Sequence, residues 1–590
     1  MGATKLAESG HSEVTSSELH HLSADRLIDN YLLYHQPHSM SKALSRAIMI
    51  VSALAFAAPA IARPLTPFAR VVVEWRAMIE PSAATGVPDY SPAGLRILEQ
   101  RLTTTRARLA AIDRRNLTPT DQINGDLIEA EMNGLDFQLR VLRPWARDPG
   151  YYATVWSEQS DVPAHEGPNA PVIDLWRYAY PLSAPDSTRL SKQLAAIPAL
   201  LDAARVNLAG SQAHDLFAYG ARAFHDQADV LAQLEAGTLE LRSLEGRRRA
   251  DLSGEGQRLR PVIRAARVAT ERFAAWIEAE APRRTGPSGI GRADYDWAAR
   301  HVYLSPYDWA AQEILLKREL SRAWAGLALE EVRNRTLPPL AMPQSANAFN
   351  QASLAKAERF TQFLIDRGMV PDRPWYRAAI PAQLVKWRPP TERDFFGHVV
   401  AQDPLPLYSH FYHWMELARM AHEPHPDPVR QGPLPFNIWQ DRSEGFATAM
   451  EELAMQAGLY DDLPRGRELV WIMLANRAAR GLASLYVQDN RMTLAEAGRF
   501  HARWTPRGWS DPDSRLVGFE QLLYLRQPGY GASYIVGKIQ LDDLLARQSE
   551  RASRAGRPFD AAATLAALAQ PGIMPLSLVE RALDAEEHAN

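Results

Sequence analysis

The 590-residue chain contains no cysteine, which excludes disulfides, Cys-ligated zinc, iron–sulfur clusters and cysteine nucleophiles. Any chemistry must therefore use His, Asp, Glu, Ser, Thr, Tyr, Lys or Arg. Lysine is also scarce, with seven residues, and the formal charge is only -3. Because no strong field steers such a chain to nucleic acid, no nucleic-acid partner is expected. The 46% hydrophobic and 23% charged composition is that of a globular protein.

Several catalytic motifs are missing as well. The sequence has no His-Glu-x-x-His zinc-ligand pair, no Gly-x-Ser-x-Gly turn, no P-loop and no Gly-x-Gly-x-x-Gly. These absences argue against a common zinc peptidase, a serine hydrolase of the α/β type, an NTPase and a dinucleotide enzyme.

No apolar run reaches the ~20 residues that a membrane-spanning helix needs. The longest run, Ala47–Ala58, follows the basic residues Lys42 and Arg46 and precedes Ala60 and Ala62, which have Ala-x-Ala spacing. This order is typical of a secretory signal. The alternative is an apolar helix packed on the core.

The predicted organisation follows from that signal. We expect a disordered leader or mis-assigned start over residues 1–39, a signal peptide over 40–62, a linker over 63–88 and one large helical domain over 89–590. A sub-boundary is expected near 285–295. The mature protein is then periplasmic or secreted, with no stable membrane insertion after cleavage.

Apolar residues recur at helical spacing through most of the chain, and no alternating run of β-branched residues is long enough for a major sheet. The fold is therefore predicted to be mainly α, with small β content possible. Helices are predicted within residues 91–141, 186–208, 220–281, 308–335, 347–367, 392–401, 408–421, 443–457, 465–489, 493–504 and 534–548.

The densest polar cluster begins on the predicted helix 408–421. His410, His413 and Glu416 follow one another there at three-residue intervals. His413 can share a site with either neighbour, whereas His410 and Glu416 lie about 120° apart on a continuous helix.

A second predicted helix carries Glu444 and Glu451, seven residues apart and on nearly one face. A helix with His and Glu that faces a helix with two carboxylates is how helical bundles build metal or acid/base sites. The alternative is structural: each His is a hydrogen-bonded core residue, and Glu444 is a carboxylate favoured by the helix dipole.

Four ordered segments occupy the C-terminal third of the chain. They are Glu444-Gly-Phe-Ala-Thr-Ala-Met-Glu451, Gly458-Leu-Tyr-Asp-Asp462, Asn476-Arg-Ala-Ala-Arg480 and Gln527-Pro-Gly-Tyr-Gly-Ala-Ser-Tyr534-Ile-Val-Gly537-Lys538. They resemble the motifs E-G-W-A-x-Y-x-E, G-L-Y-x-D, R-A-x-R and P-G-Q-A-x-x-Y-x-x-G of the bacterial domain-of-unknown-function 885 family. The resemblance runs from about Asp89 to the C-terminus and is specific within Leu405–Lys538.

The resemblance implies a helical relative of zinc metallopeptidases with a central cleft. In that family a His-Glu-x-x-Pro-Gly-His motif and the Glu of E-G-W supply the metal ligands. By position, Glu444 matches the third ligand, Glu451 the second Glu of its helix, and Tyr534 the Tyr near the cleft. The first motif does not carry over, because this chain reads His410-Phe-Tyr-His413-Trp-Met-Glu416 in its place.

Two registers are open at that point. If His410 matches the family's first His, Phe411 replaces the general-base Glu and Glu416 replaces the second His. In the other register, His413 and Glu416 form a pair that Glu444 completes. One imidazole and two carboxylates are a harder ligand set, which suits zinc less well and favours another divalent metal or none.

We therefore predict a divergent, exported, metallopeptidase-like hydrolase that acts on an amide or ester bond of a small molecule or peptide. The predicted ligands of a divalent metal, zinc or another, are His413, Glu416 and Glu444. The predicted catalytic residues are Glu451 or His410 as base and Tyr534 or Arg480 to stabilise negative charge. The alternatives are metal-free acid/base catalysis in the same cleft and an inactive pseudopeptidase that binds its ligand there.

Overall fold

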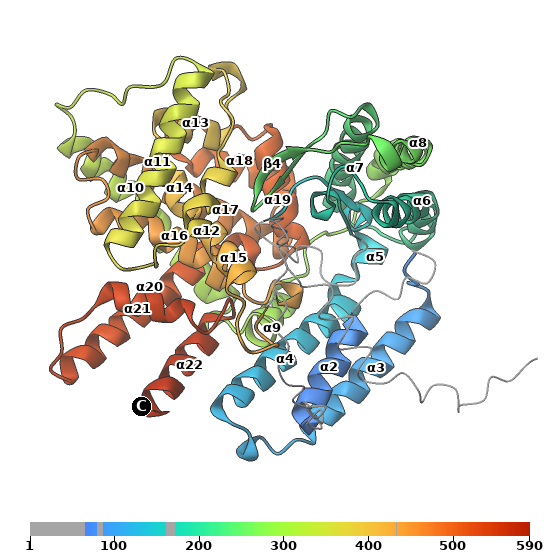
Figure 1. The fold of residues 1–590 in the computed structure, drawn as a ribbon, viewed down its shortest axis with the longest axis horizontal. Coiled ribbons are helices and arrows are strands. Elements are labelled where there is room, and N and C mark those ends of the chain that lie inside the picture. Colours follow the sequence, from blue (N-terminus) through green and yellow to red (C-terminus); the bar gives the residue numbers. More distant parts are fainter. Residues whose placement is uncertain (1–64, 80–86, 161–171, 432–433, 590) are drawn as a thin grey trace, which may run out of the picture. The chain divides into compact units, whose positions relative to one another are not determined.

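The computed structural model describes residues 65–79, 87–160, 172–431 and 434–589 (Figure 1). Residues 65–590 form one compact unit. The predicted leader at 1–39 and signal peptide at 40–62 lie outside the described residues.

The described residues are mainly α-helical, which confirms the predicted class (Figure 1). Helices of the first part are α2 (Pro67–Ile79), α3 (Pro92–Ala110), α4 (Pro119–Phe137), α5 (Pro144–Arg147), α6 (Ala184–Asn207), α7 (His214–Ala236), α8 (Arg260–Glu280) and α9 (Arg292–His301). They are followed by α10 (Trp309–Arg333), α11 (Ala346–Asp366), α12 (Pro374–Ala379), α13 (Phe395–Gln402), α14 (Leu405–His410), α15 (Tyr412–His422) and α16 (Gln440–Gln456). The last helices are α17 (Pro464–Gln488), α18 (Leu494–Trp504), α19 (Arg515–Arg526), α20 (Tyr530–Arg554), α21 (Ala561–Ala569) and α22 (Leu576–Ala589).

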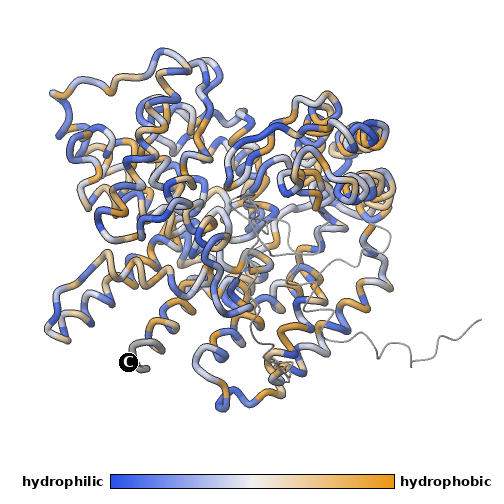
Figure 2. The backbone as a smooth tube through the Cα atoms, in the orientation of Figure 1, coloured by the Kyte–Doolittle hydropathy of each residue, from blue (hydrophilic) through white to orange (hydrophobic). Residues whose placement is uncertain are grey.

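The β content is small. Strand β1 (Val155–Trp156) pairs in parallel with β2 (Ile173–Asp174), and β3 (Glu240–Ser243) pairs antiparallel with β4 (Gly246–Arg249). The second pair interrupts the stretch 220–281, for which the sequence predicts only helix. Along the chain in Figure 2, polar and apolar residues alternate at short intervals. Within the described residues, no helix combines the length and apolar character needed to cross a membrane.

Helix starts follow local signals in the sequence. Ser91 and Thr118 precede Pro92 and Pro119, and each hydroxyl accepts a backbone N–H of the first turn. Thr493 forms a capping box with Glu496 at the start of α18. These caps place the helix starts close to where the apolar spacing predicts them.

The segment 63–88, predicted as a linker, contains helix α2. Its Trp75 is fully buried, and the indole Nε1 donates to Glu131 Oε2 at 2.6 Å. Arg76 Nη2 bonds the other oxygen of Glu131 at 2.9 Å. Helix α2 is therefore part of the core. The segment near 285–295 is bonded to distant parts of the same unit, since the N–H of Gly291 donates to the carbonyl of Gln488 at 2.8 Å.

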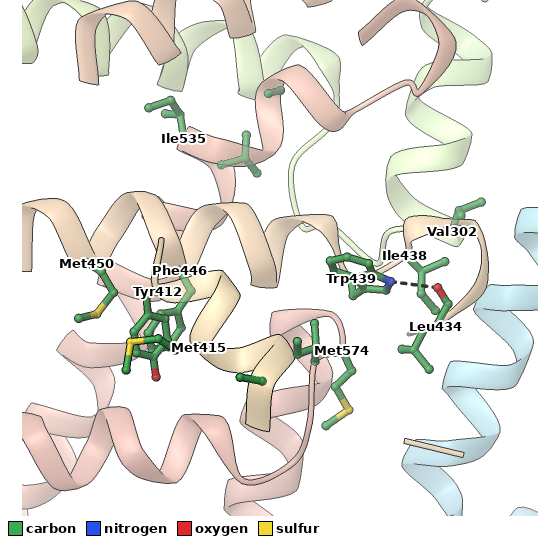
Figure 3. Close-up of a cluster of buried hydrophobic side chains, with 14 of the residues drawn as sticks. Val302, Tyr412, Met415, Leu434, Ile438, Trp439, Phe446, Met450, Ile535 and Met574 are labelled. Carbon is green, nitrogen blue, oxygen red and sulfur yellow. Dashed lines mark hydrogen bonds between the residues drawn. The ribbon is translucent and has the colours of Figure 1, made fainter. Parts of the chain in front are cut away.

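The predicted continuous helix 408–421 is two helices, α14 and α15, which is a correction to the sequence analysis. The break falls at Phe411, whose ψ of 9° leaves the helical range. Tyr412, the first residue of α15, then stacks on Phe446 of α16 with ring centroids 5.0 Å apart. Figure 3 shows this pair with Met415 and Met450 in the core.

Helices α16 and α20 cross at a pair of glycines. A Cβ on Gly445 would overlap the backbone of Gly537, and a Cβ on Gly537 would overlap the carbonyl oxygen of Asp441. Only residues without a side chain allow this approach. The contact brings Glu444 next to the first turns of α20. The central cleft that the family resemblance implies stays a prediction.

Candidate metal centre

Three side chains from three helices converge in the core. His410 ends α14, His413 lies in the first turn of α15, and Glu444 lies on α16. Each offers a ligand atom, and these atoms lie within 4.8 Å of one another. The three residues are only 6%, 2% and 3% exposed. This group could hold a metal ion.

The two imidazoles lie on either side of the break at Phe411. Their rings meet at a centroid distance of 5.0 Å and nearly at right angles. The sequence analysis assumed a continuous helix there, and the angles it derived do not apply.

Glu416, one of the three predicted ligands, lies outside this group. Both its oxygens accept hydrogen bonds from Arg442, at 2.5 and 3.0 Å. Arg442 is fully buried and packs over the ring of Phe446. The carboxylate of Glu416 therefore neutralises a buried arginine, and His410 takes the remaining place beside His413 and Glu444.

Glu444 is held by α20. The hydroxyl of Tyr530 donates to Oε1 of Glu444. The other oxygen, Oε2, lies 3.3 Å from His410 Nε2. Oε2 is buried and accepts no hydrogen bond from the described residues.

Glu451 lies on the other side of the His410 ring. Its Oε1 is 3.0 Å from His410 Nδ1, so the two glutamates seven residues apart flank one imidazole. Arg477 of α17 bonds Oε2 of Glu451 at 2.8 Å and lies 2.6 Å from Oε1. Burial lowers the pKa of His410 to about 3. The positive charge of Arg477 also lowers this pKa, whereas the carboxylate of Glu451 raises it. The ring is therefore neutral near pH 7, as a metal ligand must be.

Tyr534 and Arg480 complete the surroundings. The Tyr534 ring stacks on His410 with centroids 5.9 Å apart. The guanidinium of Arg480 lies 4.3 Å above the Tyr534 ring, and its Nη1 bonds the buried Glu520. Of the four predicted catalytic residues, His410 thus belongs to the His/His/Glu group itself, and Glu451, Tyr534 and Arg480 lie around it, but Glu451 and Arg480 are each engaged by a residue of opposite charge.

Sequence reasoning missed three of these neighbours, namely Tyr530, Arg477 and Glu520. Tyr530 lies one helical turn before Tyr534, so the spacing of the last motif could have indicated it. Arg477 lies within the Asn476–Arg480 motif. No signal in the sequence pairs Glu520 with Arg480.

Fold and site together define a mainly α protein with a buried His/His/Glu group that could hold a metal. Residues 78–322 match the sequence model of the family described as "Bacterial protein of unknown function (DUF885)". This match confirms the predicted resemblance to that family. It ends before Glu444, so the motifs themselves lie beyond it. No curated protein is detectably similar to the chain.

Two solved structures share the fold. One is a presumed lipoprotein of unknown function from Shewanella oneidensis, with a TM-score of 0.58 and 13% identity over 87% of this chain and 97% of the other. The other is a presumed lipoprotein from Colwellia psychrerythraea, with a TM-score of 0.58 and 13% identity over 88% and 97%. At this identity the likeness shows the fold alone.

Proposed function

We propose that this protein is an exported, metal-dependent hydrolase in which His410, His413 and Glu444 hold one divalent metal ion. The observation that carries the proposal is the convergence of these three buried side chains from separate helices. Its substrate would contain an amide or ester bond, in a small molecule or a peptide.

The donor set fits zinc. Two imidazoles and one glutamate are the protein ligands of several catalytic zinc sites, in which a fourth position stays open. Ligand atoms ~2.0–2.1 Å from zinc at tetrahedral corners lie about 3.3 Å apart, and His410 Nε2 and Glu444 Oε2 are separated by 3.3 Å. With the ring proton of His410 on Nδ1, towards Glu451, Nε2 and Glu444 Oε2 would be two acceptors close together in the core, which favours a cation between them.

The neighbours suit this role. Glu451 and Arg477 would fix the ring of His410, in the way that carboxylates orient metal-bound imidazoles. Tyr530 would fix Glu444. A bound zinc ion would supply Lewis acidity and activate water. Tyr534, stacked on His410 and covered by Arg480, is placed to stabilise negative charge.

The site departs from the family pattern in the residue that would act as general base. In the register that aligns His410 with the family's first His, Phe411 stands in place of the general-base Glu, and Glu451 is bound by Arg477. This observation favours a second candidate, in which the protein holds the metal and binds a ligand without turning it over.

Export is part of the proposal. The signal predicted over residues 40–62 and the lipoprotein descriptions of both solved relatives agree on a place in the cell envelope. We expect a periplasmic or secreted protein that carries no nucleic acid.

Metal analysis of the purified protein tests the proposal. We expect about one equivalent of a divalent metal, lost in Glu444→Ala and retained in His501→Gln, which changes a buried histidine elsewhere in the core. A wild-type protein that binds no divalent metal would refute it. Retained metal without hydrolysis of amide or ester substrates would select the binding protein, and turnover that is insensitive to chelators would select metal-free acid/base catalysis.

A further inference from the structure

A second buried polar cluster adjoins the metal centre on the far side of Arg480. Asn476, Arg480 and Ser484 follow one another at four-residue intervals on α17, so they lie along one side of that helix. They are 1%, 3% and 1% exposed. A polar stripe on the buried part of a helix needs partners from its neighbours.

Helices α18 and α19, which both pack on α17 and on each other, supply some of these partners (Figure 1). Asn476 Nδ2 lies 2.7 Å from His501 Nε2. Arg480 Nη1 bonds Glu520. Burial lowers the pKa of His501 to about 3, and the charge of Arg480 acts in the same direction, so the two side chains face one environment.

Many polar atoms of the cluster still have no partner among the described residues. They are Asn476 Oδ1, Arg480 Nε, Ser484 Oγ and His501 Nδ1; both amide atoms of Gln521, the residue that follows Glu520 on α19, have none either. Gln521 lies on α19 and is 2% exposed. An isolated unsatisfied atom is ordinary, but six such atoms on three packed helices require an occupant that forms hydrogen bonds with them.

The chemistry of these atoms selects the ligand class. With Asn476 donating to Nε2, the neutral His501 ring carries its proton on Nδ1 and is a donor there, as are Arg480 Nε and the Gln521 amide nitrogen. The amide oxygens of Asn476 and Gln521 are acceptors. Because Glu520 balances the charge of Arg480, the cluster suits a neutral group that both donates and accepts, which is an amide.

We propose that this cluster on α17, α18 and α19 is a subsite that binds an amide group of a peptide or carboxamide substrate. Arg480 connects it to the metal centre, since its guanidinium lies over Tyr534 and Tyr534 stacks on His410. The proposal rests on the proposed function and adds the substrate class to it.

Ligand-observed NMR on the full chain tests it, with the neutral diamide N-acetyl-L-alanine methylamide as probe and N-acetyl-L-alanine methyl ester as the comparison. We expect the diamide to bind more tightly than the ester. Gln521→Met, which keeps the shape but removes both unsatisfied atoms, should weaken diamide binding at least tenfold. Ser484→Ala gives a second, smaller perturbation and should weaken binding at least twofold.

Gln488→Met is the matched control. Gln488 lies further along the same stripe, but its amide nitrogen already donates to the carbonyls of Tyr524 and Leu525. It should lower the melting temperature and leave the diamide affinity unchanged. Gln521→Met should not lower the melting temperature, because it removes unsatisfied groups.

Wild-type protein that binds no diamide, or equal diamide affinity in wild type, Gln521→Met and Ser484→Ala, would overturn the proposal and leave ordered water as the occupant. The titration is run on zinc-loaded and on EDTA-treated protein. Diamide binding to a protein that takes up no zinc would support the subsite and refute the metal centre, whereas zinc uptake without diamide binding would do the reverse.

Discussion

Replacing Glu451 with Gln should weaken metal binding without removing a ligand. In the proposed site, Glu451 holds the ring of His410 from the side opposite Glu444, with Oε1 3.0 Å from Nδ1. An amide in place of this carboxylate holds the imidazole less firmly. Losses of this kind cost 10- to 100-fold in metal affinity, or about 1.4–2.7 kcal/mol.

The variant also removes charge from a buried ion pair. Arg477 is 1% exposed and pairs with Glu451 alone among the described acids. Breaking a buried pair costs about 3–5 kcal/mol, and Gln keeps one acceptor, so we expect the lower end of that range. Loss of stability by itself could loosen the site, and a control must separate the two effects.

Glu416→Gln provides that control. It breaks an equally buried pair, with Arg442, which joins α15 to α16 and lies outside the His/His/Glu group. Urea unfolding of the metal-free proteins should show similar losses for both variants, while zinc titration against a competing chelator should show weaker binding only for Glu451→Gln. Equal affinity losses would refute the positioning role. Loss of zinc in Glu416→Gln alone would restore the ligand set His413, Glu416 and Glu444.

Three further variants probe the surroundings. Gly537→Ala places a Cβ against the Asp441 carbonyl and should cost about 1–3 kcal/mol in urea unfolding, whereas Gly210→Ala, with open space around it, should change little; equal effects would contradict the close helix crossing. Tyr530→Phe removes the hydrogen bond to Glu444 and should weaken zinc binding by about 1 kcal/mol in the chelator titration, and an unchanged affinity would speak against that bond. Burial lowers the pKa of His501 in the folded protein to about 3, below its value in the unfolded chain. The stability of the folded protein that depends on the neutral ring is therefore fully present above pH 6.5 and is lost as the pH falls towards 3. Between pH 6 and 4, protonation of His501 should lower the free energy of unfolding by about 1.4 kcal/mol per pH unit. His501→Gln should abolish this part of the pH dependence.

The sequence predicts the long helices well because each has a buried stripe with helical spacing. Helix α10 (Trp309–Arg333) falls within one residue or two of the predicted range 308–335, and α17 (Pro464–Gln488) within one residue of 465–489. Buried side chains recur along one side of such helices, and the spacing of apolar residues in the sequence shows this pattern directly. Class and helix positions therefore follow from local information.

The break at Phe411 could not be predicted in the same way. Neither Pro nor Gly lies between Leu407 and Glu416, so the local sequence favours one helix. Contacts from elsewhere, such as Phe446 against Tyr412, hold α15 in its own direction. The ligand set depends on the folded geometry, because His410 and His413 converge while Glu416 pairs with Arg442. A geometry set by tertiary packing overrides the helical wheel.

Arginine partners determine which glutamate is available as a metal ligand. Glu416, Glu451 and Glu520 each face a buried arginine from a different stretch of the chain, at Arg442, Arg477 and Arg480. Glu444 differs, since one oxygen takes the Tyr530 hydroxyl and the other faces His410. The sequence alone does not distinguish these glutamates. Only the folded structure shows that Glu444 keeps an oxygen without a hydrogen-bond donor among the described residues, whereas the other three neutralise arginines.

That separation makes metal binding and catalysis independent questions for this protein. The chain keeps the residues that would hold a divalent ion, and it arranges Glu451, Arg477 and Tyr530 to hold those residues in turn. The same pairing withdraws Glu451 from acid/base work, and in the register that aligns His410 with the family's first His, Phe411 stands in place of the general-base Glu. The geometry therefore bears more directly on metal binding than on turnover. Hydrolysis measured on protein of known metal content is thus the observation that separates a divergent enzyme from a binding protein.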